Sequence, residues 1–579
     1  MRLSLLAYWS LLADYLRGQR GRVAALAVLL CGGIAAQLAN PLILRFFIDA
    51  AVAGRSPGVL TAAAALFVAV ALVGQGVGLT ETYLAEQVGW RATNALRADL
   101  AAHCLGLDPA FHRAHPPGAL IERIDGDVTA LANFFSRFVI AVLGNLILLG
   151  GILAILFGVD PRAGLALTAF TLLVLLALHR LREVAAPRWR AFRAASADLY
   201  GFLEERLRGA EDLRPNGAVG HTLGLLVPLL GTLLRRFRAA SVAAGASWGA
   251  TVVLFALGSA VALGLGAALF RAGAITIGTV YLIFSYTEQL RRPLEQISRQ
   301  VQDLQQAAAG IARVRELLDT RSAITDGAGA PLPGGALAVT FAGVSFGYDA
   351  GEPVLREVSV DLPAGRTLGV LGRTGGGKTT LARLLFRLHD PDVGTIRLGG
   401  VDLQDLRLAD LRARVGLVTQ DVQLFAASVR DNLTFFDRRI PDEHLHRVLA
   451  ELGLAAWSRA LPAGLDTPLA PDALSAGEAQ MLALCRVFLK DPGVVILDEA
   501  SARLDPATER QLDRALERLL AGRTAIVIAH RLATVARADD IVILEGGRIA
   551  EYGPRDRLAR DPDSRFARLL RAGLAEVAG

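Results

Sequence analysis

The chain is predicted to fold as two domains of different class, an all-α bundle of six transmembrane helices followed by an α/β domain. The first half of the 579-residue sequence holds six long apolar runs with few charges, and about 20 apolar residues suffice to cross a bilayer. The second half alternates short apolar, strand-like runs with helical patterns. Within it, a glycine-rich loop at residues 372–379 separates a strand-like run from a helical pattern.

This loop, GRTGGGKT, gives the clearest chemical signal and fits the pattern G-x-x-x-x-G-K-[ST] in its required strand–helix context. Backbone N–H groups of such a loop close around phosphate oxygens, its lysine reaches the outer phosphates, and its hydroxyl binds Mg²⁺. A glycine-rich turn with a solvated lysine is the alternative. We therefore predict a nucleoside triphosphate site. Its expected residues are Gly372, Arg373, Thr374, Gly375, Gly376, Gly377, Lys378, Thr379 and Thr380.

Composition narrows the classes of function. The net charge is only +6 and the arginine clusters lie between apolar runs, which fits membrane topology and leaves no nucleic-acid partner expected. Lys378 and Lys490 are the two lysines, so the loop keeps a compact ammonium in an arginine-rich chain. Cys31, Cys104 and Cys485 are scattered and form no metal or disulfide spacing.

The six apolar runs define the predicted membrane domain, residues 21–318. They lie near Val23–Phe47, Val59–Leu79, Phe135–Leu156, Gly164–His179, Val242–Phe270 and Ile275–Leu290. The connections after the second and fourth runs are long and rich in arginine, which predicts cytoplasmic termini. Residues 1–20 are predicted to form an interfacial elbow helix because aromatic residues recur there at helical spacing. An extension of the first span is the alternative.

The long connections are expected to be helical. Each has room for two helices of about 25 residues, about 37 Å at 1.5 Å per residue, with turns at Asp108–His112 and Gly209–Leu213. Charged residues within the spans are scarce apart from Glu81 and Glu288, so the bundle does not read as an ion pathway. Residues 319–335, rich in Gly and Pro, are a predicted linker before the α/β domain at 336–579.

Three further segments of the second half resemble the ABC transporter family. Val494–Glu499 is an apolar strand that ends in two carboxylates, Leu474–Gln480 stands in the place of the family signature, and His530 follows a third apolar run. With the loop and the six spans, they resemble exporters in which one membrane half is fused to one ATPase domain, over essentially the whole chain. The resemblance implies a RecA-like ATPase domain with a helical subdomain, ATP and Mg²⁺ as cofactors, and ATP-driven export by alternating access.

The resemblance also implies roles for matching residues. Glu499 is expected to be the general base for the attacking water, His530 to contact the γ-phosphate, and Tyr348 to stack on adenine. The implied metal ligands are Thr379, Gln420 and Asp498, and the implied ATP-binding residues also include Gln420 and Asp505. Taken singly, Gln420 reads as a surface residue, His530 as an ordinary histidine and Tyr348 as a core aromatic. Their order along the chain favours the functional roles.

The signature segment departs from the family pattern. In LSAGE, Ser475 and Gly477 keep the residues that cover ATP held by the opposite subunit, and Asp505 is kept in a later loop. Ala476 and Glu478 replace the usual Gly and Gln. ATP is therefore expected to lie between two halves. Because the changes fall on the surface offered to the partner, a heterodimer with a related half-transporter is favoured over a homodimer.

Two alternatives come from other classes of protein. One is an ATP-gated or regulatory half-subunit with weak hydrolysis, against which the intact Glu499 and His530 argue. The other is a soluble-type ABC ATPase, which the six spans exclude. A lipid flippase and a multidrug-type exporter are not separated, although few membrane charges favour an apolar or amphipathic cargo. The expected location is a bacterial plasma membrane, with the ATPase domain in the cytoplasm and lipids as neighbours.

Overall fold

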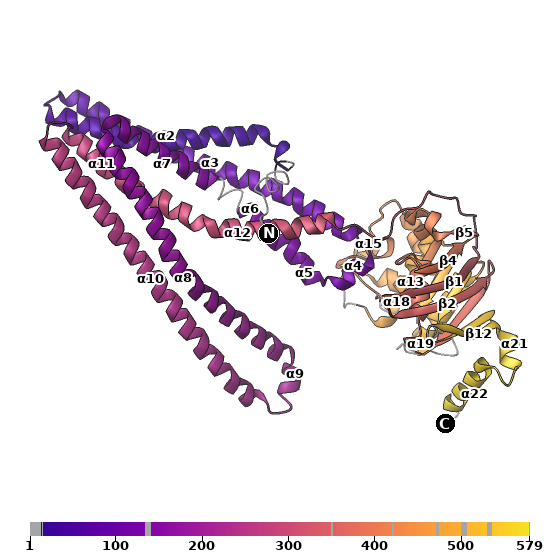
Figure 1. Cartoon of the computed structure of the whole chain (residues 1–579). Helices are drawn as coiled ribbons and strands as arrows, with labels where there is room; N and C mark the ends of the chain where they lie inside the picture. Colours follow the sequence, from indigo (N-terminus) through magenta and orange to yellow (C-terminus); the bar gives the residue numbers. More distant parts are fainter. Residues whose placement is uncertain are drawn as a thin grey trace. The chain divides into compact units, whose positions relative to one another are not determined.

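The computed structural model describes residues 13, 15–133, 140–348, 351–373, 375–419, 422–470, 474–498, 506–529, 535 and 537–577. The chain divides into two compact units (Figure 1). The first comprises Met1–Leu105 and Pro117–Thr320, and the second comprises Gly106–Pro116 and Arg321–Gly579. The short segment Gly106–Pro116 therefore belongs to the unit that contains the α/β domain.

The regular structure described in the first unit is all helical. Its elements are α2 (Arg20–Val52), α3 (Pro57–Gly106), α5 (Pro117–Ile121), the π-helix η1 (Glu122–Asp127), α6 (Val128–Asn133), α7 (Ile140–Val159), α8 (Pro161–Arg208), α9 (Ala210–Leu213), α10 (Val219–Arg271), α11 (Ile277–Gln289) and α12 (Arg291–Asp319). Tyr15–Arg17 is helical and a turn at Gly18–Gln19 precedes α2. Most of the expected elbow helix lies outside the described residues.

Five of the described helices are long and apolar enough to cross a membrane, namely α2, α3, α7, α8 and α10. The sixth expected span coincides with α11, which has 13 residues. It continues almost without a break into α12, because Leu290 between them keeps a helical backbone and its N–H donates to Tyr286 O at 3.1 Å. The sixth span thus stays a prediction, since α11 is not among the described helices long enough to cross a membrane.

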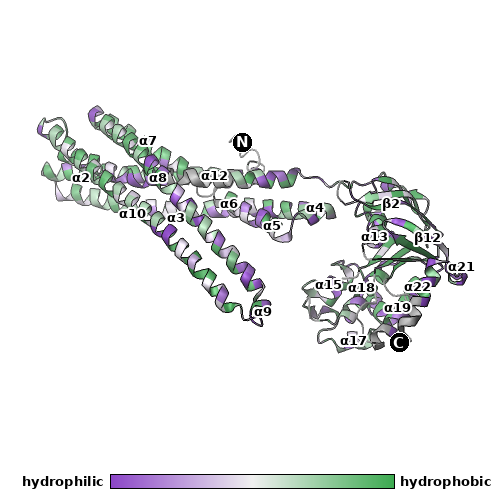
Figure 2. Ribbon diagram, turned by 60° about the horizontal axis from the view of Figure 1, so that its bottom comes forward, coloured by the Kyte–Doolittle hydropathy of each residue, from purple (hydrophilic) through white to green (hydrophobic). Residues whose placement is uncertain are grey.

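The helices expected in the long connections are continuous with the spans. The helices α3, α8 and α10 have 50, 48 and 53 residues, or about 70–80 Å at 1.5 Å per residue. In Figure 2, hydrophilic residues become more frequent along α8 and α10 toward α9, which joins their far ends. Each helix therefore crosses the apolar layer and continues beyond it.

Buried contacts fix the ends of the sixth span. Tyr286 is fully buried and its hydroxyl donates to Leu38 O at 2.8 Å. The Asp49 carboxylate accepts from the N–H of Gly278 at 2.9 Å and from the hydroxyl of Thr276 at 2.7 Å, which satisfies the open N-terminus of α11. At Gly278 a Cβ atom would lie 2.4 Å from Arg45 O. Only glycine allows this approach of α11 to α2.

The second unit is built on a six-stranded sheet in the order β12-β11-β3-β10-β9-β6. Its strands are β3 (Thr367–Gly372), β6 (Val415–Val418), β9 (Val494–Asp498), β10 (Thr524–Ile528), β11 (Asp540–Glu545) and β12 (Arg548–Pro554). All neighbours pair in parallel except β11 and β12. Every residue of β9 and β10 is buried, as expected for strands covered on both faces.

An antiparallel sheet in the order β2-β1-β4-β5 packs beside it. Its strands are β1 (Val339–Gly347), β2 (Pro353–Leu362), β4 (Val393–Leu398) and β5 (Val401–Asp402). Buried residues of both sheets and of α13 (Lys378–Leu385) form one hydrophobic core. This core sets the position of the glycine-rich loop between β3 and α13.

A second core supports a helical subdomain. Its helices are α15 (Val429–Thr434), α16 (Asp442–Glu451), α17 (Ala455–Ala460), α18 (Ala476–Lys490) and α19 (Pro506–Leu520), and the strands β7 (Ala427–Ser428) and β8 (Pro468–Leu469) pair beside them. The unit also contains α4 (Pro109–Ala114), α14 (Leu408–Arg414), α21 (Arg555–Arg560), α22 (Arg565–Val577) and the 3₁₀ turns η3 (Leu403–Asp405) and η4 (Gly464–Asp466).

Candidate nucleotide-binding site

The glycine-rich loop adopts a backbone that other residues would strain. Gly372, Gly375 and Gly377 have φ angles of +150°, +81° and +96°. A Cβ atom on Gly372 would lie 2.3 Å from Leu544 O, and one on Gly377 would lie 2.6 Å from a side-chain carbon of Leu355. Glycine is therefore required at Gly372 and Gly377 by conformation and by space.

The loop ends at the N-terminus of α13, where Gly377 is the N-cap and Lys378 the first helical residue. Lys378 is buried, and its ammonium donates to the carbonyl oxygens of Gly372 at 2.7 Å and Arg373 at 3.2 Å. Thr379 is half-buried and Thr380 is buried in the same first turn. A cation and a helix N-terminus thus converge on one small volume, which suits a polyanion.

Strand register places Asp498 at the same edge of the sheet. Asp498 pairs with Ile528 of β10, and Ile528 pairs with Val370 of β3, two residues before the loop begins. The carboxyl ends of β3, β9 and β10 therefore meet there, and Asp498 is 7% exposed. A carboxylate and the Thr379 hydroxyl are oxygen donors of the kind that Mg²⁺ prefers. The described residues contain no cluster of three or more His, Cys, Asp or Glu side chains.

Tyr348 follows β1 and lies against α13. Its hydroxyl is 3.2 Å from the hydroxyl of Thr380 and accepts a hydrogen bond from Arg383 at 3.0 Å. Phe346 and His389 make edge-to-face contacts with its ring at centroid distances of 5.1 and 5.4 Å. The expected adenine-stacking residue is thus beside the first turn of the phosphate-binding helix.

The signature residues lie at the start of α18. Ser475 is its N-cap and forms a capping box with Glu478, while Gly477 is buried in the first turn. The Glu478 carboxylate accepts from the N–H of Ser475 at 2.9 Å and from its hydroxyl at 2.8 Å. The serine hydroxyl at this helix end is therefore already bonded to a negative group.

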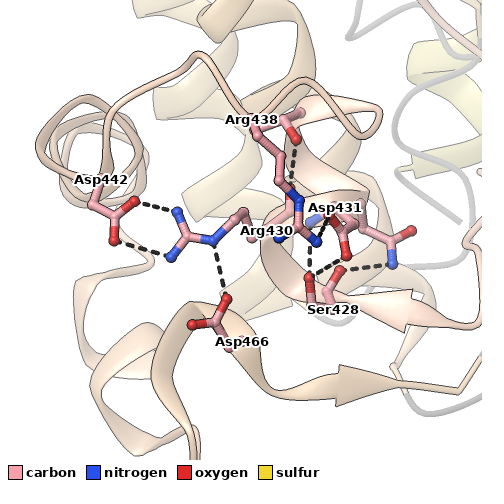
Figure 3. A network of polar contacts seen from close by, with 8 residues as sticks. Ser428, Arg430, Asp431, Arg438, Asp442 and Asp466 are labelled. Atoms are coloured by element: carbon pink, nitrogen blue, oxygen red, sulfur yellow. Dashed lines mark hydrogen bonds and ion pairs between the residues drawn. The ribbon is translucent and has the colours of Figure 1, made fainter.

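A charge network joins α15, α16 and η4 within the helical subdomain (Figure 3). Arg430 of α15 makes a bidentate contact with Asp442 at the start of α16, one bond of which is 2.9 Å, and a 3.0 Å bond with Asp466 of η4. The Ser428 hydroxyl caps the same helix through the N–H of Asp431 at 3.0 Å. One side chain thus joins three elements that are separate in the sequence.

A groove of about 700 Å³ opens between the sheet and this subdomain. Its wall includes Phe425 and Phe435, which are 38% and 58% exposed, and Arg486, whose guanidinium lies 4.6 Å from the centroid of the Phe435 ring. Arg486 also donates to Asn432 O at 2.7 Å, which fixes its position. The groove therefore offers exposed aromatic surface beside a held positive charge.

Five of the expected site residues lie outside the described part of the chain: Thr374, Gln420, Glu499, Asp505 and His530. Of the others, the structure brings together Tyr348, the glycine loop, Lys378, Thr379, Thr380 and Asp498 around one sheet edge. Sequence reasoning missed Arg383 and His389 beside Tyr348. The sequence could have indicated Arg383, because a residue three positions after Thr380 lies on the same side of a helix. No sequence pattern indicated His389.

Comparison with known proteins agrees with this architecture. Residues 23–294 match the ABC transporter transmembrane region and residues 355–502 match the ABC transporter family. The chain is 33% identical to the ATP-dependent lipid A-core flippase of Thiobacillus denitrificans, over 84% of this chain and 85% of that protein. It is also 33% identical to a multidrug efflux ATP-binding/permease protein of Mycobacterium tuberculosis, over 94% of this chain and 46% of that protein.

A solved structure gives the same result for the fold. The structure of a bacterial Atm1-family ABC exporter with ATP bound superposes with a TM-score of 0.78 and 26% sequence identity, covering 96% of this chain and 98% of that chain. The chain therefore belongs to the ABC transporter family. It is an exporter-type half-transporter, a multi-pass membrane protein whose ATPase domain binds and hydrolyses ATP to drive export. The expected fold class and activity are confirmed.

Proposed function

We propose that this half-transporter pairs with a second, related half, and that ATP is hydrolysed at the interface of their ATPase domains. The observation that carries the hydrolytic role is the convergence of Lys378, Thr379 and Asp498 at the carboxyl edge of the sheet. The matching M. tuberculosis protein is covered only to 46% by this chain. That length supports a working unit made of two such halves.

The chemistry at this chain's loop follows from its side chains. Lys378 and the loop N–H groups would bind the outer phosphates, and Thr379, Asp498 and Gln420 would hold Mg²⁺, which would neutralise charge on the transferred group. Glu499 accepts a proton from water, whose oxygen bonds to the γ-phosphorus while the bond to the β–γ bridging oxygen breaks. ADP and inorganic phosphate then leave.

The other residues surround this centre. His530 would contact the γ-phosphate, Tyr348 would stack on the adenine, and Asp505 would contribute to ATP binding. The partner supplies its signature segment across the nucleotide. In return, Ser475 and Gly477 of this chain cover the ATP held by the partner.

We propose that the partner is a different chain. Glu478 places a carboxylate on Ser475 at the N-terminus of α18, where the partner's γ-phosphate is expected. Like charges brought within a few ångströms in a closed site repel strongly. A homodimer has this repulsion at both ATP sites. A heterodimer has one ATP site without it, which combines the partner's signature with this chain's Lys378 and Asp498.

The cargo is an amphipathic lipid or an apolar small molecule. A cavity of about 330 Å³ lies among α8, α10 and α11, within their apolar spans. Among the described residues, its lining includes Phe170, Leu173, Leu257 and Ile283 and no charged side chain. The close approach at Gly258, where a Cβ atom would meet the Phe170 ring, shapes one wall. An apolar wall of this kind favours hydrocarbon.

Orientation and coupling follow the charge pattern. The arginine-rich ends of α3, α8 and α10 support an ATPase domain on the cytoplasmic side of a bacterial plasma membrane. The turn around α9 is the expected coupling element for an ATPase domain. Nucleotide-driven closure is then transmitted to the long helices, and the bundle alternates between inward-open and outward-open states.

The test is ATP binding and ATPase activity of the full-length chain alone in lipid nanodiscs, beside Glu499→Gln. A chain that binds ATP and hydrolyses it poorly, and that becomes active with a co-purified half-transporter, supports the heterodimer. Strong activity of the chain alone, lost in Glu499→Gln, contradicts the heterodimer and supports a homodimer. Failure to bind ATP contradicts the assigned site.

A further inference from the structure

An arginine from the helical connection between the second and third spans covers the face of Tyr348. The guanidinium carbon of Arg113 lies 4.3 Å from the centroid of the Tyr348 ring, well within the range of a cation–π contact. Arg113 belongs to α4, in the segment Gly106–Pro116 that is part of the second compact unit. The contact was not expected from the sequence, since these residues are far apart in the chain.

A second contact fixes α4 in this position. Asp108 is the N-cap of α4, and one carboxylate oxygen accepts from the N–H of Phe111 at 3.0 Å. Its other oxygen accepts from the N–H of Ala323 at 2.8 Å and from the hydroxyl of Ser322 at 3.3 Å. The helix is thus bound to the segment that precedes the ATPase domain. This attachment holds α4 in place, so that Arg113 contacts Tyr348.

Tyr348 is held at its other end as well. Its hydroxyl contacts Thr380 at 3.2 Å and Arg383 at 3.0 Å. Thr380 is in the first turn of α13, where the phosphates of a nucleotide are expected to bind. The ring therefore lies between Arg113 on its face and the phosphate-binding helix at its tip.

This arrangement leaves no room for a base between Arg113 and Tyr348. Flat groups in van der Waals contact lie about 3.5–4 Å apart. A base stacked between the ring and the guanidinium would therefore require a separation of about 7–8 Å, against 4.3 Å here. Adenine and Arg113 cannot share this face of Tyr348 at the same time.

We propose that Arg113 is a positioning residue of the nucleotide site, which holds Tyr348 closed over α13 until adenine displaces it. Entry of the base then breaks the Arg113–Tyr348 contact and releases one attachment of α4. Because α4 follows α3 directly in the chain, arrival of the nucleotide is reported to the membrane helices before hydrolysis. The inference rests on the proposed adenine-stacking role of Tyr348.

The experiment compares equilibrium dissociation constants for ATP and for inorganic triphosphate on the full-length chain in nanodiscs. Arg113→Ala is expected to lower the dissociation constant for ATP by about two- to fivefold, the factor that loss of one partly exposed cation–π contact gives. Arg113→Lys keeps the positive charge, so its dissociation constant for ATP is expected to stay near that of the wild type. Triphosphate has no base to stack, so its dissociation constant changes by less than about twofold. A general folding defect would weaken the binding of both ligands.

Tyr348→Phe is a second test, because it keeps the ring and removes the hydroxyl contacts to Thr380 and Arg383. Tyr348→Phe is also expected to tighten ATP binding. In the double variant with Arg113→Ala, the gain in binding free energy is expected to be smaller than the sum of the two single gains, since both changes release the same closed ring. Arg560→Ala, which removes an exposed arginine of α21, is the charge control and leaves the dissociation constant for ATP unchanged.

The outcomes separate this inference from the proposed function. Tyr348→Ala is expected to weaken ATP binding, because the stacking surface is lost. If it does so while Arg113→Ala leaves ATP binding unchanged or weakens it, Arg113 does not hold the ring closed and the inference is wrong. If Tyr348→Ala leaves ATP binding unchanged, both the adenine role and the inference are wrong.

Discussion

Glu478 and Ser475 close the N-terminus of α18 on each other: one carboxylate oxygen of Glu478 accepts both the N–H and the hydroxyl of Ser475, at 2.9 and 2.8 Å. The N–H of Glu478 in turn lies 3.3 Å from the serine hydroxyl oxygen. A carboxylate here stabilises the helix end in the isolated chain. In the proposed dimer, the same charge would oppose a phosphate bound by the partner. The interaction would then favour the folded half at the expense of the closed dimer.

Glu478→Gln is expected to raise the ATPase activity of the assembled transporter by about fivefold, the effect of relieving about 1 kcal/mol of repulsion at the γ-phosphate. The amide keeps the length of the side chain and can still accept the N–H of Ser475. Activity is measured with the partner half present. Glu443→Gln, an exposed acidic residue in the first turn of α16, is the matched control. A fall in activity on Glu478→Gln would show that the carboxylate assists closure.

The glycine loop allows a comparison of two substitutions. Both introduce backbone strain, but only one introduces steric overlap. Gly377→Ala and Gly375→Ala each place a side chain at a left-handed φ, which costs about 1–3 kcal/mol. Only the Cβ atom introduced by Gly377→Ala meets neighbours, at 2.6 Å from Leu355 and 3.1 Å from Val354 O. We expect Gly377→Ala to weaken ATP binding by more than about tenfold, since strain and overlap together exceed about 1.4 kcal/mol, and Gly375→Ala by clearly less. Equal losses in titrations with ATP would show that strain alone decides.

The parts of the nucleotide site that could be predicted from the sequence are those in which a chemical motif and a local secondary-structure pattern fall in the same segment. The run Leu368–Leu371 is the centre of β3, and the helix expected after the loop begins at Lys378. The apolar run before Asp498 is β9, fully buried as a strand of a parallel sheet. These features depend on short-range patterns and on glycine conformation, so one segment of sequence suffices to find them.

Other features depend on distant pairings and were not predictable. Pro187 and Pro228 are examples: each lies inside a long helix, α8 or α10, that continues from a span without a break. The π-helix η1 is fixed from outside, since Arg313 of α12 pairs with the buried Asp127 within it. The contact of Arg113 with Tyr348 likewise follows from docking of α4, for which single-residue patterns carry no signal.

The network around Arg430 predicts how the helical subdomain is stabilised. Arg430 is 17% exposed and joins α15, α16 and η4, and its hydrogen bonds lower the pKa of Asp442. Arg430→Ala is expected to lower the midpoint of thermal unfolding more than Asp466→Asn, which removes one partner. The matched control is Arg439→Ala, since Arg439 is 91% exposed and pairs with Asp437, two residues away in the chain.

The dependence of thermal stability on salt concentration tests whether ion pairing in this network is the cause. If ion pairing is the cause, the difference between wild type and Arg430→Ala becomes smaller at about 1 M salt, where the Debye length is about 3 Å. A difference that does not change with salt would instead indicate lost packing of the arginine stem.

His389 gives a prediction for pH. Burial lowers the pKa of His389 below its usual value, and the positive charges of Arg113 and Arg383 lower it further, while Asp108 and Asp390 oppose this effect. The folded chain therefore binds a proton at His389 less readily than the unfolded chain. The stability that neutral His389 provides is present above about pH 6.5, the ordinary value, and is lost as the pH falls through the lower folded pKa.

Thermal unfolding of wild type and His389→Gln at about pH 7.5 and about pH 5.5, on either side of the ordinary histidine pKa, tests this sign. Wild type is expected to lose more stability on acidification than His389→Gln, because only wild type must place a charge beside Phe346 and Tyr348. Arg113→Ala removes one of the positive charges, so it raises the pKa of His389 and makes the acid loss smaller. Equal acid losses in all three proteins would contradict a role for His389, whereas a larger loss in Arg113→Ala would show that Arg113 stabilises this corner by packing instead of opposing protonation.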